Sequence, residues 1–383
     1  MKVLHPFPWF SIKYAGGTSD LMFKIIKAQK KAGLEPLVLT GDYKYDAELA
    51  NRLEGVEFTI VGSYLDALGF SLMPALFFRL PDLMRKIDIV HLHAYRTFQN
   101  VIVYLFCKIY KVPYVMDAHG AVPYHQNKRL LKKIFDILIG HRMLRDAQSL
   151  IGETEVGKQE YIDLYPATSS KKIHILSPPF DTDEFLELPE KGIFREKYSI
   201  EADRKVVMFL GRIHYSKGND FLIKGFAEAI KQRSDLLLVL VGPDDGHMDF
   251  CKELANSLGV EDDVLFTGFL GGDEKNSALG DADIVVQLSR FEQGAWAPLE
   301  GVLCKTPIIV TRDTGTGEDV ERIKAGYLVD FDDVTGLSDM IISVLDNYED
   351  AKDLTETARN HIIDNLSMNA RVHEYTDIYK DIN

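Results

Sequence analysis

The strongest constraint on the fold is a repeated alternation of short apolar runs with helical segments. The apolar run Lys2–His5 is followed, after a stretch of turn residues, by the segment Leu21–Lys31, whose apolar residues recur at helical spacing. Gly33 marks the end of that helix, and Pro36–Thr40 is the next apolar run. Strand, glycine turn, helix and strand form the beginning of a βαβ unit, so the sequence predicts a parallel sheet covered by helices.

The alternation continues and then starts again after Pro178-Pro179. In the first half we predict strands at Ile87–His93, Pro113–Asp117, Ser149–Gly152 and His174–Leu176, and helices at Asn100–Tyr110 and Lys128–Arg145. In the second half we predict a helix at Asn219–Lys231 and strands at Lys205–Leu210, Leu236–Val241, Val264–Thr267, Ile284–Gln287 and Thr306–Val310. A chain of 383 residues is long enough for two cores.

The fold prediction is therefore an α/β protein with two Rossmann-like domains, whose parallel sheets face each other across a cleft. We place the first domain at residues 1–178 and the second at 179–365. The last segment, 366–383, contains a predicted helix from Met368 to Asp381 that the pattern alone leaves open to either domain.

Charge and composition limit the kind of partner. The net charge is −14: residues 1–178 carry 23 Lys and Arg against 17 Asp and Glu (+6), and the rest carries 21 against 41 (−20). This acidic balance argues against nucleic acid, and the difference between the halves is explained either by different partners or by an acidic surface that aids solubility. The three cysteines show no metal or disulfide spacing, and no apolar run approaches the ~20 residues that span a bilayer. We expect a cytoplasmic protein that does not cross a membrane.

Two cations lie in the loop after the first strand of the second half. Arg212 and Lys217 fall between Gly211 and Gly218, at the carboxyl end of a predicted strand and before a helix. Open α/β sheets bind ligands at this edge, and a helix N-terminus favours anions. The pair suits a pyrophosphate, although taken alone it is equally explained as solvated loop residues.

Two glutamates follow a later strand of the same half. Glu292 lies in the predicted turn after Ile284–Gln287, and Glu300 lies eight residues further on, in a helix predicted at Leu299–Leu303. Carboxylates at such positions can accept hydrogen bonds from sugar and ribose hydroxyls. Two glutamates at this spacing are, by themselves, more typical of a surface than of a site.

Taken together, these motifs resemble the family four retaining glycosyltransferases, which have the GT-B architecture. The resemblance covers nearly the whole chain and is carried by Gly16-Gly17, Asp88–His93, His119-Gly120, Asp181–Phe185, Gly211-Arg212, Lys217-Gly218, Glu292, Glu300, Thr306-Pro307, Gly315, Gly317-Glu318 and Ala325–Asp330. It implies a sugar transferred from a UDP- or GDP-sugar to a hydroxyl acceptor, with retention and without a metal or other cofactor. In that family the last helix crosses back to the first domain.

The resemblance also implies roles for individual residues. Arg212 and Lys217 would hold the donor pyrophosphate beside Gly211, and Glu300 with Leu299 would lie at the ribose. Glu292 would contact the donor sugar, together with backbone amides of the next residues, Gln293, Gly294, Ala295 and Trp296. On the acceptor side, His119 would lie over the donor sugar, with Gly16, Gly17 and His93 nearby. The catalytic residues implied are thus Glu292, His119, Lys217 and Arg212.

The chain departs from the family pattern at two places. The family usually has glycine three residues after the first glutamate, whereas this chain has Ala295 there and Gly294 one residue earlier. The linker has Pro179-Phe180 where the family usually has Asn-Gly. Asp181 and Asp183 resemble a metal-binding pair but align with that linker, so we expect no metal site.

Histidines and a basic segment complete the candidates. His119 alone would be interpreted as structural, and only the resemblance gives it a role. We expect His91 and His93 to point to opposite faces of their strand, with His93 near the acceptor and His91 structural. The segment Lys128–Arg145 is basic and amphipathic, so it either lies on an anionic membrane, where a lipid-linked acceptor would be found, or packs its apolar stripe into the core.

Two alternatives to an active glycosyltransferase remain. One is a catalytically idle protein of the same fold that binds a glycan or a partner, which the Ala295 and linker departures favour. The other is an NAD-dependent oxidoreductase, which the sequence supports poorly because the Gly16-Gly17 turn does not have the spacing of a dinucleotide-binding loop.

Overall fold

The computed structural model describes residues 1–67, 70–124, 129–168, 172–177, 179–294 and 296–382. Its backbone contacts divide the chain into two compact units. Unit 1 contains Met1–Phe180 and Leu366–Asn383, and unit 2 contains Asp181–Asn365. The first division falls two residues after the boundary expected at 178/179, and the second coincides with the one expected at 365/366.

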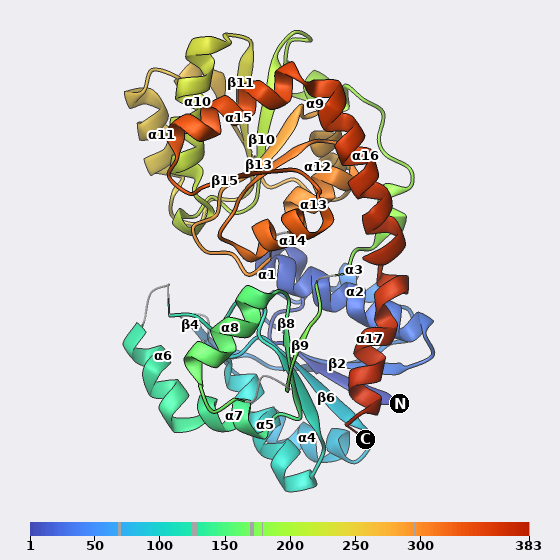
Figure 1. Ribbon diagram of the computed structural model, residues 1–383. Helices are drawn as coiled ribbons and strands as arrows, with labels where there is room; N and C mark the ends of the chain where they lie inside the picture. Colours follow the sequence, from blue (N-terminus) through green and yellow to red (C-terminus); the bar gives the residue numbers. More distant parts are fainter. Residues whose placement is uncertain (68–69, 125–128, 169–171, 178, 295, 383) are drawn as a thin grey trace. The chain divides into compact units, whose positions relative to one another are not determined.

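Unit 1 is built on a seven-stranded parallel sheet with the order β3-β2-β1-β6-β7-β8-β9, as far as the described residues show (Figure 1). The strands are β1 (Lys2–Pro6), β2 (Glu35–Gly41), β3 (Glu57–Val61), β6 (Ile89–His93), β7 (Tyr114–Asp117), β8 (Ser149–Gly152) and β9 (Ile173–Ile175). A small antiparallel pair, β4 (Tyr64–Ala67) and β5 (Phe70–Leu72), lies apart from this sheet. The order reverses between β1 and β6, which is the switch point of a doubly wound sheet.

Most helices of unit 1 bury apolar residues. The helices of this unit are α1 (Ile12–Ala15), α2 (Gly17–Lys31), α3 (Ala47–Asn51), α4 (Leu76–Met84), α5 (Phe98–Tyr110), α6 (Arg129–Phe135), the π-helix η1 (Asp136–Gly140), α7 (His141–Asp146), α8 (Glu155–Leu164) and α17 (Met368–Lys380). Of these, α1 and α6 have no buried residue. In α2, the predicted register is confirmed, because Met22, Ile25 and Ile26 are buried and pack on the sheet core. The predicted loop through residues 16–20 is wrong, since α2 begins at Gly17.

Unit 2 repeats the same topology with a six-stranded parallel sheet in the order β12-β11-β10-β13-β14-β15, again within the described part of the chain. The strands are β10 (Lys205–Leu210), β11 (Leu236–Val241), β12 (Val264–Gly268), β13 (Ile284–Gln287), β14 (Ile308–Thr311) and β15 (Tyr327–Val329). The helices are η3 (Thr182–Phe185), α9 (Ile193–Lys197), η4 (Tyr215–Lys217), α10 (Asn219–Gln232), α11 (Met248–Ser257), η5 (Glu261–Asp263), α12 (Gly272–Asp281), α13 (Trp296–Leu303), α14 (Gly315–Ile323), α15 (Val334–Asp346) and α16 (Tyr348–Asn365). Its switch point lies between β10 and β13.

The two chain segments that connect the units pair with each other at the edge of unit 1. The Phe180 amide donates to the Leu366 carbonyl at 2.8 Å, and the Met368 amide donates to the Phe180 carbonyl at 2.7 Å. The helix α17 follows directly and packs against α2 (Figure 1). This last helix is therefore part of unit 1.

Candidate active site

The loops after β10 and β13 of unit 2 meet at the switch point with almost no space between their backbones. Gly218 has a φ of 68°, and a Cβ built on it would lie 1.9 Å from the Leu288 carbonyl oxygen. A Cβ on Gly242, at the end of β11, would lie 1.8 Å from the Gly211 carbonyl oxygen. Side chains at these glycines would push the loops apart, so the glycines set the shape of the carboxyl edge.

Lys217 and Glu292 are brought together at this edge. The Lys217 Nζ forms an ion pair with Glu292 Oε2, and their side chains are 18% and 14% exposed. The Ser289 hydroxyl also donates to Glu292 Oε2, at 3.1 Å. Lys217 directly precedes Gly218 and the N-terminus of α10, where backbone N–H groups favour an anion. A cation and a carboxylate predicted from separate motifs thus share one point of the structure.

Arg212 lies on the same loop but has a different partner. Its guanidinium pairs with Asp245, which follows β11, and both side chains are exposed to solvent. The structure therefore places the two predicted cations on one loop without bringing them to a common carboxylate. Asp245 was not predicted, because it lies 33 residues from Arg212 and belongs to no recognisable motif.

Glu300 is buried in α13 and pairs with a lysine that the sequence did not point out. Its Oε1 lies 2.8 Å from the Nζ of Lys275, a residue of α12. Leu299 and Gln293 are also buried, Gly294 lies in the loop before the helix, and Trp296 begins it. The helix expected at Leu299 therefore starts three residues earlier. Ala295, predicted to touch the donor sugar, lies outside the described residues.

Arg290 fastens the Glu292 loop to the loop that carries Lys217. Its guanidinium donates two hydrogen bonds to the Asp220 carboxylate, at 2.7 and 2.5 Å, and a third to the Tyr215 carbonyl at 2.6 Å. Its backbone amide donates to the Ser216 carbonyl at 2.8 Å. These contacts of Arg290 with Asp220 and Tyr215 are called the Arg290–Asp220 clamp. A pocket of about 320 Å³ lies beside it and is lined by Tyr215, Ser289, Arg290, Phe291, Thr311, Asp313, Thr314 and Phe331.

At the switch-point edge of unit 1, Gly16 and Gly17 lie where α1 gives way to α2. Gly16 has a φ of 60° and open space around a Cβ, and Gly17 is the first residue of α2. Gly16 therefore serves the turn between the helices, since its conformation is one that side chains rarely adopt.

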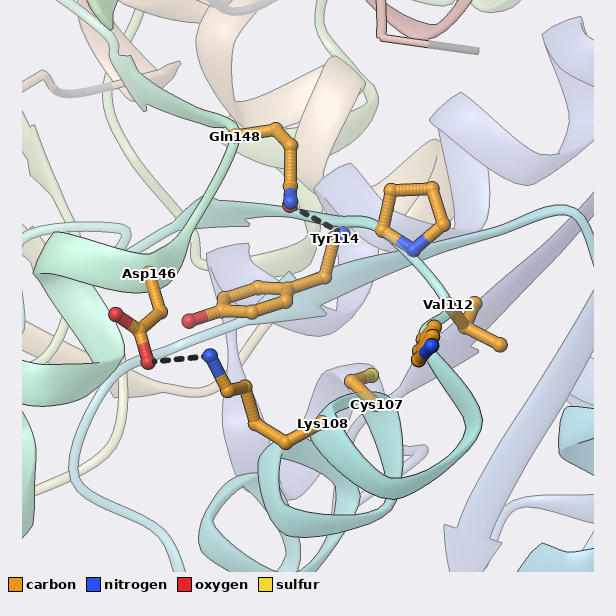
Figure 2. Close-up of a pocket in the computed structure, with 8 residues that line it drawn as sticks. Cys107, Lys108, Val112, Tyr114, Asp146 and Gln148 are labelled. Carbon is orange, nitrogen blue, oxygen red and sulfur yellow. Dashed lines mark hydrogen bonds and ion pairs between the residues drawn. The ribbon is translucent and has the colours of Figure 1, made fainter.

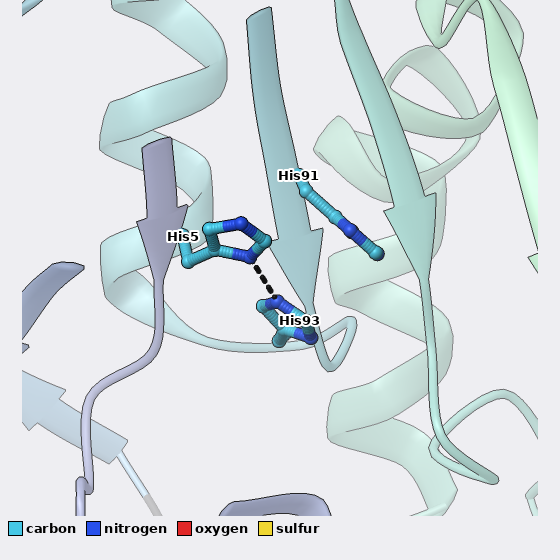
Figure 3. A group of neighbouring side chains, drawn as sticks. All are labelled: His5, His91 and His93. Atoms are coloured by element: carbon cyan, nitrogen blue, oxygen red, sulfur yellow. Dashed lines mark hydrogen bonds between the residues drawn. The ribbon is translucent and has the colours of Figure 1, made fainter. Parts of the chain in front are cut away.

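His93 and His119 are joined with further histidines in one buried cluster at the same edge. His93 Nδ1 lies 2.9 Å from His119 Nε2, and His93 Nε2 lies 2.9 Å from His5 Nδ1. The prediction that His91 and His93 point to opposite faces is wrong: their rings stack with centroids 4.3 Å apart (Figure 3). Residues two apart on a strand lie on the same face, so the spacing itself contained the correct answer.

His119 lies between two carboxylates. Its Nδ1 is 3.1 Å from Asp117 Oδ1 and 3.2 Å from Glu153 Oε1, and its side chain is 3% exposed. Burial opposes its positive charge, but Asp117 and Glu153 outweigh burial and raise its pKa. Burial raises the pKa of Asp117 to about 7, against the opposing effect of His119. Burial lowers the pKa of His5 to about 4, and those of His91 and His93 well below the ordinary value.

Two groups in this cluster have the residue types of a metal site. They are His5, His91 and His93, and Asp117, His119 and Glu153. In the first, ring nitrogens of His5 and His93 face each other, and their other nitrogens face Gln29 and His119; His91 Nδ1 faces Tyr379. In the second, one imidazole nitrogen faces two carboxylates, a donor set that suits either a hydrogen-bonded proton or a small cation.

A second pocket, of about 230 Å³, lies at the opposite edge of the unit 1 sheet (Figure 2). It is lined by Cys107, Lys108, Lys111, Val112, Pro113, Tyr114, Asp146 and Gln148, and Tyr114 is the first residue of β7. Open parallel sheets bind ligands at their carboxyl ends, so this pocket at the amino end is a weaker candidate.

Both units thus have Rossmann-like topology, and both gather their predicted polar residues at the carboxyl edge of the switch point. These features define the chain as an α/β protein of two tandem Rossmann-like domains. HepE from Anabaena, solved in complex with UDP and glucose, has the same fold: the TM-score is 0.78 at 19% identity, with 98% of this chain and 99% of that chain covered.

Sequence relatives identify the family. Residues 15–184 match Glycosyltransferase Family 4, and residues 190–361 match Glycosyl transferases group 1. An uncharacterized glycosyltransferase of Methanocaldococcus jannaschii is 24% identical over 304 residues, which span 77% of this chain and 75% of the relative. The N-acetyl-alpha-D-glucosaminyl L-malate synthase of Bacillus anthracis is 30% identical over 190 residues, about half of each chain. The chain belongs to the family four glycosyltransferases and has the GT-B fold.

Across the part of the chain that the structure describes, we find no helix with the length and apolar character needed to span a membrane.

Proposed function

We propose that the protein transfers a sugar from a nucleoside diphosphate sugar to a hydroxyl acceptor, with retention of the anomeric configuration. The observation that carries this proposal is the Lys217–Glu292 pair, held at the unit 2 switch point beside the α10 N-terminus. Lys217 and the helix N-terminus would bind the donor pyrophosphate, with Arg212 as a second cation. Glu292 would accept hydrogen bonds from the donor sugar.

The neighbouring Glu300 is proposed to bind the ribose. Lys275 holds one carboxylate oxygen of Glu300 at 2.8 Å, which orients this buried side chain. A buried carboxylate can accept the ribose hydroxyls. The donor we propose is a UDP- or GDP-sugar. HepE, which has the same fold, was solved with UDP, and a relative from Mycolicibacterium smegmatis is a GDP-mannose-dependent mannosyltransferase.

In the proposed reaction the acceptor oxygen attacks the anomeric carbon on the face from which the diphosphate leaves. The bond between the anomeric carbon and the diphosphate oxygen breaks as the new glycosidic bond forms, and the acceptor proton passes to a diphosphate oxygen. Lys217 and Arg212 would neutralise the charge that develops on the diphosphate. His119 is proposed to act near the donor sugar, and no step requires a metal ion or another cofactor.

The test is calorimetric binding of UDP, GDP, ADP and NAD to the purified protein and to Lys217→Ala. We expect one nucleoside diphosphate to bind and the variant to bind it at least ten times more weakly, because the variant lacks a charged partner of the pyrophosphate. If none of the diphosphates binds, the proposal fails. Binding of NAD alone would favour the oxidoreductase alternative.

Slow hydrolysis of the donor without an acceptor separates an active enzyme from an idle protein of the same fold. An active transferase cleaves the bound donor slowly with water, whereas an idle protein binds the donor without turnover. If the protein binds the diphosphate but never cleaves the nucleotide sugar, with or without an acceptor, it is the idle alternative.

For the acceptor we propose a lipid-linked glycan or polysaccharide precursor at a membrane surface. Along α6 and η1 the apolar side chains Leu130, Leu131, Ile134 and Leu138 are between 45% and 71% exposed, as is Ile137, so the interpretation of this stripe as core is wrong for them. Leu144 in α7 is buried, as that interpretation expects. The basic residues Arg129, Lys132, Lys133 and Arg142 lie on the same segment. Lys128, predicted as its first residue, lies outside the described residues. Exposed apolar side chains between cations suit the interface of an anionic bilayer, on the inner face of the membrane.

Sedimentation with vesicles that contain anionic lipid tests this contact. The double variant Lys132→Glu, Lys133→Glu should remain in the supernatant where the unaltered protein pellets. The matched control is Lys231→Glu, Lys352→Glu in unit 2, which changes the net charge equally and should still pellet. Equal sedimentation of both double variants would contradict the membrane contact.

A further inference from the structure

The histidine cluster of unit 1 is part of a longer hydrogen-bonded chain of buried side chains. From His119 it runs through His93 and His5, as described above, and then to Gln29, whose Oε1 lies 2.8 Å from His5 Nε2. The Gln29 amide donates to the Tyr379 hydroxyl at 2.9 Å, and that hydroxyl lies 2.7 Å from His91 Nδ1. These hydrogen bonds thus connect the loop after β7 with β6, β1, α2 and α17, the last of which lies at the far end of the sequence.

Counting the protons along this chain fixes the state of His119. The Gln29 oxygen is an acceptor, so His5 Nε2 donates and His5 Nδ1, its other nitrogen, accepts in a neutral ring. His93 Nε2 must then donate to His5, and His93 Nδ1 must accept from His119 Nε2. His119 Nδ1 faces an oxygen of Asp117 and an oxygen of Glu153. A proton on that nitrogen can be shared with both acids, whereas a proton on Asp117 would leave the Glu153 oxygen without one. Both nitrogens of His119 therefore carry a proton.

We propose that His93, His5, Gln29 and Tyr379 are positioning residues that hold His119 as an imidazolium at the carboxyl edge of unit 1. This inference rests on the proposed function, in which His119 acts near the donor sugar, and it adds the charge that His119 brings there. A fixed positive charge at that place would favour a donor whose leaving group becomes more negative as the reaction proceeds.

The hydrogen bonds between Gln29 and His119 could also run in the opposite donor-to-acceptor direction, but the groups around His119 disfavour that alternative. If the Gln29 amide were rotated, every proton would point toward His119, whose Nε2 would accept and whose ring would be neutral. The polarity that follows when Gln29 Oε1 faces His5 instead lets a cationic His119 donate to His93. Such charge-assisted hydrogen bonds are the stronger ones, and they polarise the hydrogen bonds that follow them. Gln29 also ends the route by which a proton could move from His119 through His93 and His5, because an amide does not take up a proton at neutral pH.

The groups that surround His119 are consistent with this state. Burial lowers the pKa values of His5, His91 and His93, so these rings stay neutral near pH 7, and burial raises the pKa values of Tyr161 and Tyr375 well above the ordinary value. The acids that face His119 and raise its pKa are Asp117 on β7, whose own pKa is raised by burial to about 7, and Glu153 after β8. A buried cation needs such partners to compensate for its lost hydration.

Nuclear magnetic resonance of the full-length protein, with ring-labelled histidine and no nucleotide present, tests the proposal directly. We expect His93 and His5 to remain neutral Nε2–H tautomers from pH 5 to 8, and His119 to be doubly protonated at pH 7. If His93 is found as the Nδ1–H tautomer, or if His119 is neutral at pH 7, the proposal is wrong. This measurement needs no variant.

Two substitutions of Gln29 should move the His119 pKa in opposite directions. Gln29→Met removes the acceptor that the His5 Nε2–H needs, which disfavours the polarity that a cationic His119 requires and should lower its pKa by ~0.5–1. Gln29→Glu offers acceptors to both His5 and Tyr379, which favours that polarity and should raise the pKa. The control, His174→Gln, alters a histidine outside the chain and should leave the pKa of His119 unchanged.

Shifts of the same sign in both Gln29 variants, or no shift in either, would overturn the proposal, since a merely structural role for Gln29 predicts no opposed pair. The outcome is independent of nucleotide binding. A protein that binds no nucleoside diphosphate but shows the expected tautomers would contradict the proposed function and leave the proton assignment intact.

Discussion

Replacing Lys217 by alanine should abolish most of the turnover while leaving the fold almost unchanged. A charge pair separated by ~4 Å at an effective dielectric constant of ~20 interacts by roughly 4 kcal/mol. That dielectric constant suits this place, because the side chains of Lys217 and Glu292 are 18% and 14% exposed. For Lys217 and a donor phosphate, part of this attraction is offset, because Lys217 must first leave Glu292. A remainder of about 3–4 kcal/mol corresponds to a decrease in kcat/KM of roughly 10²–10³-fold.

The effect on stability should be much smaller. A partly exposed ion pair contributes about 1 kcal/mol or less to the free energy of unfolding, so we expect Tm to fall by only a few degrees. The Glu292 carboxylate keeps its hydrogen bond from Ser289 after the substitution. The loop itself is held by the Arg290–Asp220 clamp, which the substitution does not touch.

The assay is release of the nucleoside diphosphate from the nucleotide sugar whose diphosphate binds in calorimetry, with Tm measured on the same samples. Lys231→Ala is the matched control, because Lys231 pairs with Glu228 on the exposed surface of α10 and takes no part in the proposed site. We expect the control to retain full activity. A folded Lys217→Ala protein that keeps more than about a third of kcat/KM would refute the assignment of Lys217 to the leaving group.

Three further outcomes follow from the same structure. Glu300→Gln should weaken binding of the ribonucleoside diphosphate by roughly 10–100-fold, since a hydrogen bond to a charged group contributes ~1.5–3 kcal/mol, whereas binding of the 2′-deoxy analogue should change much less; equal losses for both ligands would remove Glu300 from the ribose. Dialysis against EDTA should leave turnover unchanged, and a loss restored by a divalent cation would point to Asp117, His119 and Glu153 as its ligands. The free energy of unfolding should fall as the pH falls from about 6.5 to 4, because the unfolded chain protonates His5 before the folded protein does; the contribution is on the order of 3 kcal/mol, and His5→Gln should show a correspondingly weaker dependence in urea titrations.

The strands were predictable from the sequence because their physics is local. Runs such as Leu236–Val241 are continuously apolar, as expected for parallel strands buried on both faces, and they lie where the pattern put them. Two helix starts were wrong for reasons that a pattern does not contain. Residues 17–20 look like a turn, but buried Ser19 donates to the Trp9 carbonyl at 2.7 Å and extends α2 to Gly17. The helix expected at Leu299 begins at Trp296, so Pro298 lies in the first turn of α13, where proline is tolerated.

The site was predictable only in part, because motifs name residues and not their partners. Glu300 and Lys217 stand at recognisable spacings, but Lys275 and Asp245 reach the edge of the sheet from other elements and have no motif of their own. The histidine chain shows the same limit. His5 lies at the end of the first predicted strand and His93 at the end of β6, so the strand pattern indicates that these two residues lie near each other. Gln29 and Tyr379 come from two helices and are 350 residues apart in sequence, which no local pattern indicates.

The partners that the sequence missed change how donor binding should be understood. Lys217, Arg212 and Glu300 each have an oppositely charged partner within their own unit, namely Glu292, Asp245 and Lys275. A pyrophosphate would therefore have to take Lys217 and Arg212 from existing carboxylates, so its affinity reflects an exchange of partners and is smaller than the full attraction to two cations. The exchange also frees the Glu292 carboxylate at the moment the pyrophosphate takes Lys217, which makes that carboxylate available to the hydroxyls of the donor sugar. Because the two events share one ion pair, binding of the pyrophosphate and recognition of the sugar should be coupled in this protein. A diphosphate without its sugar should take Lys217 from Glu292 and supply no sugar hydroxyl in its place.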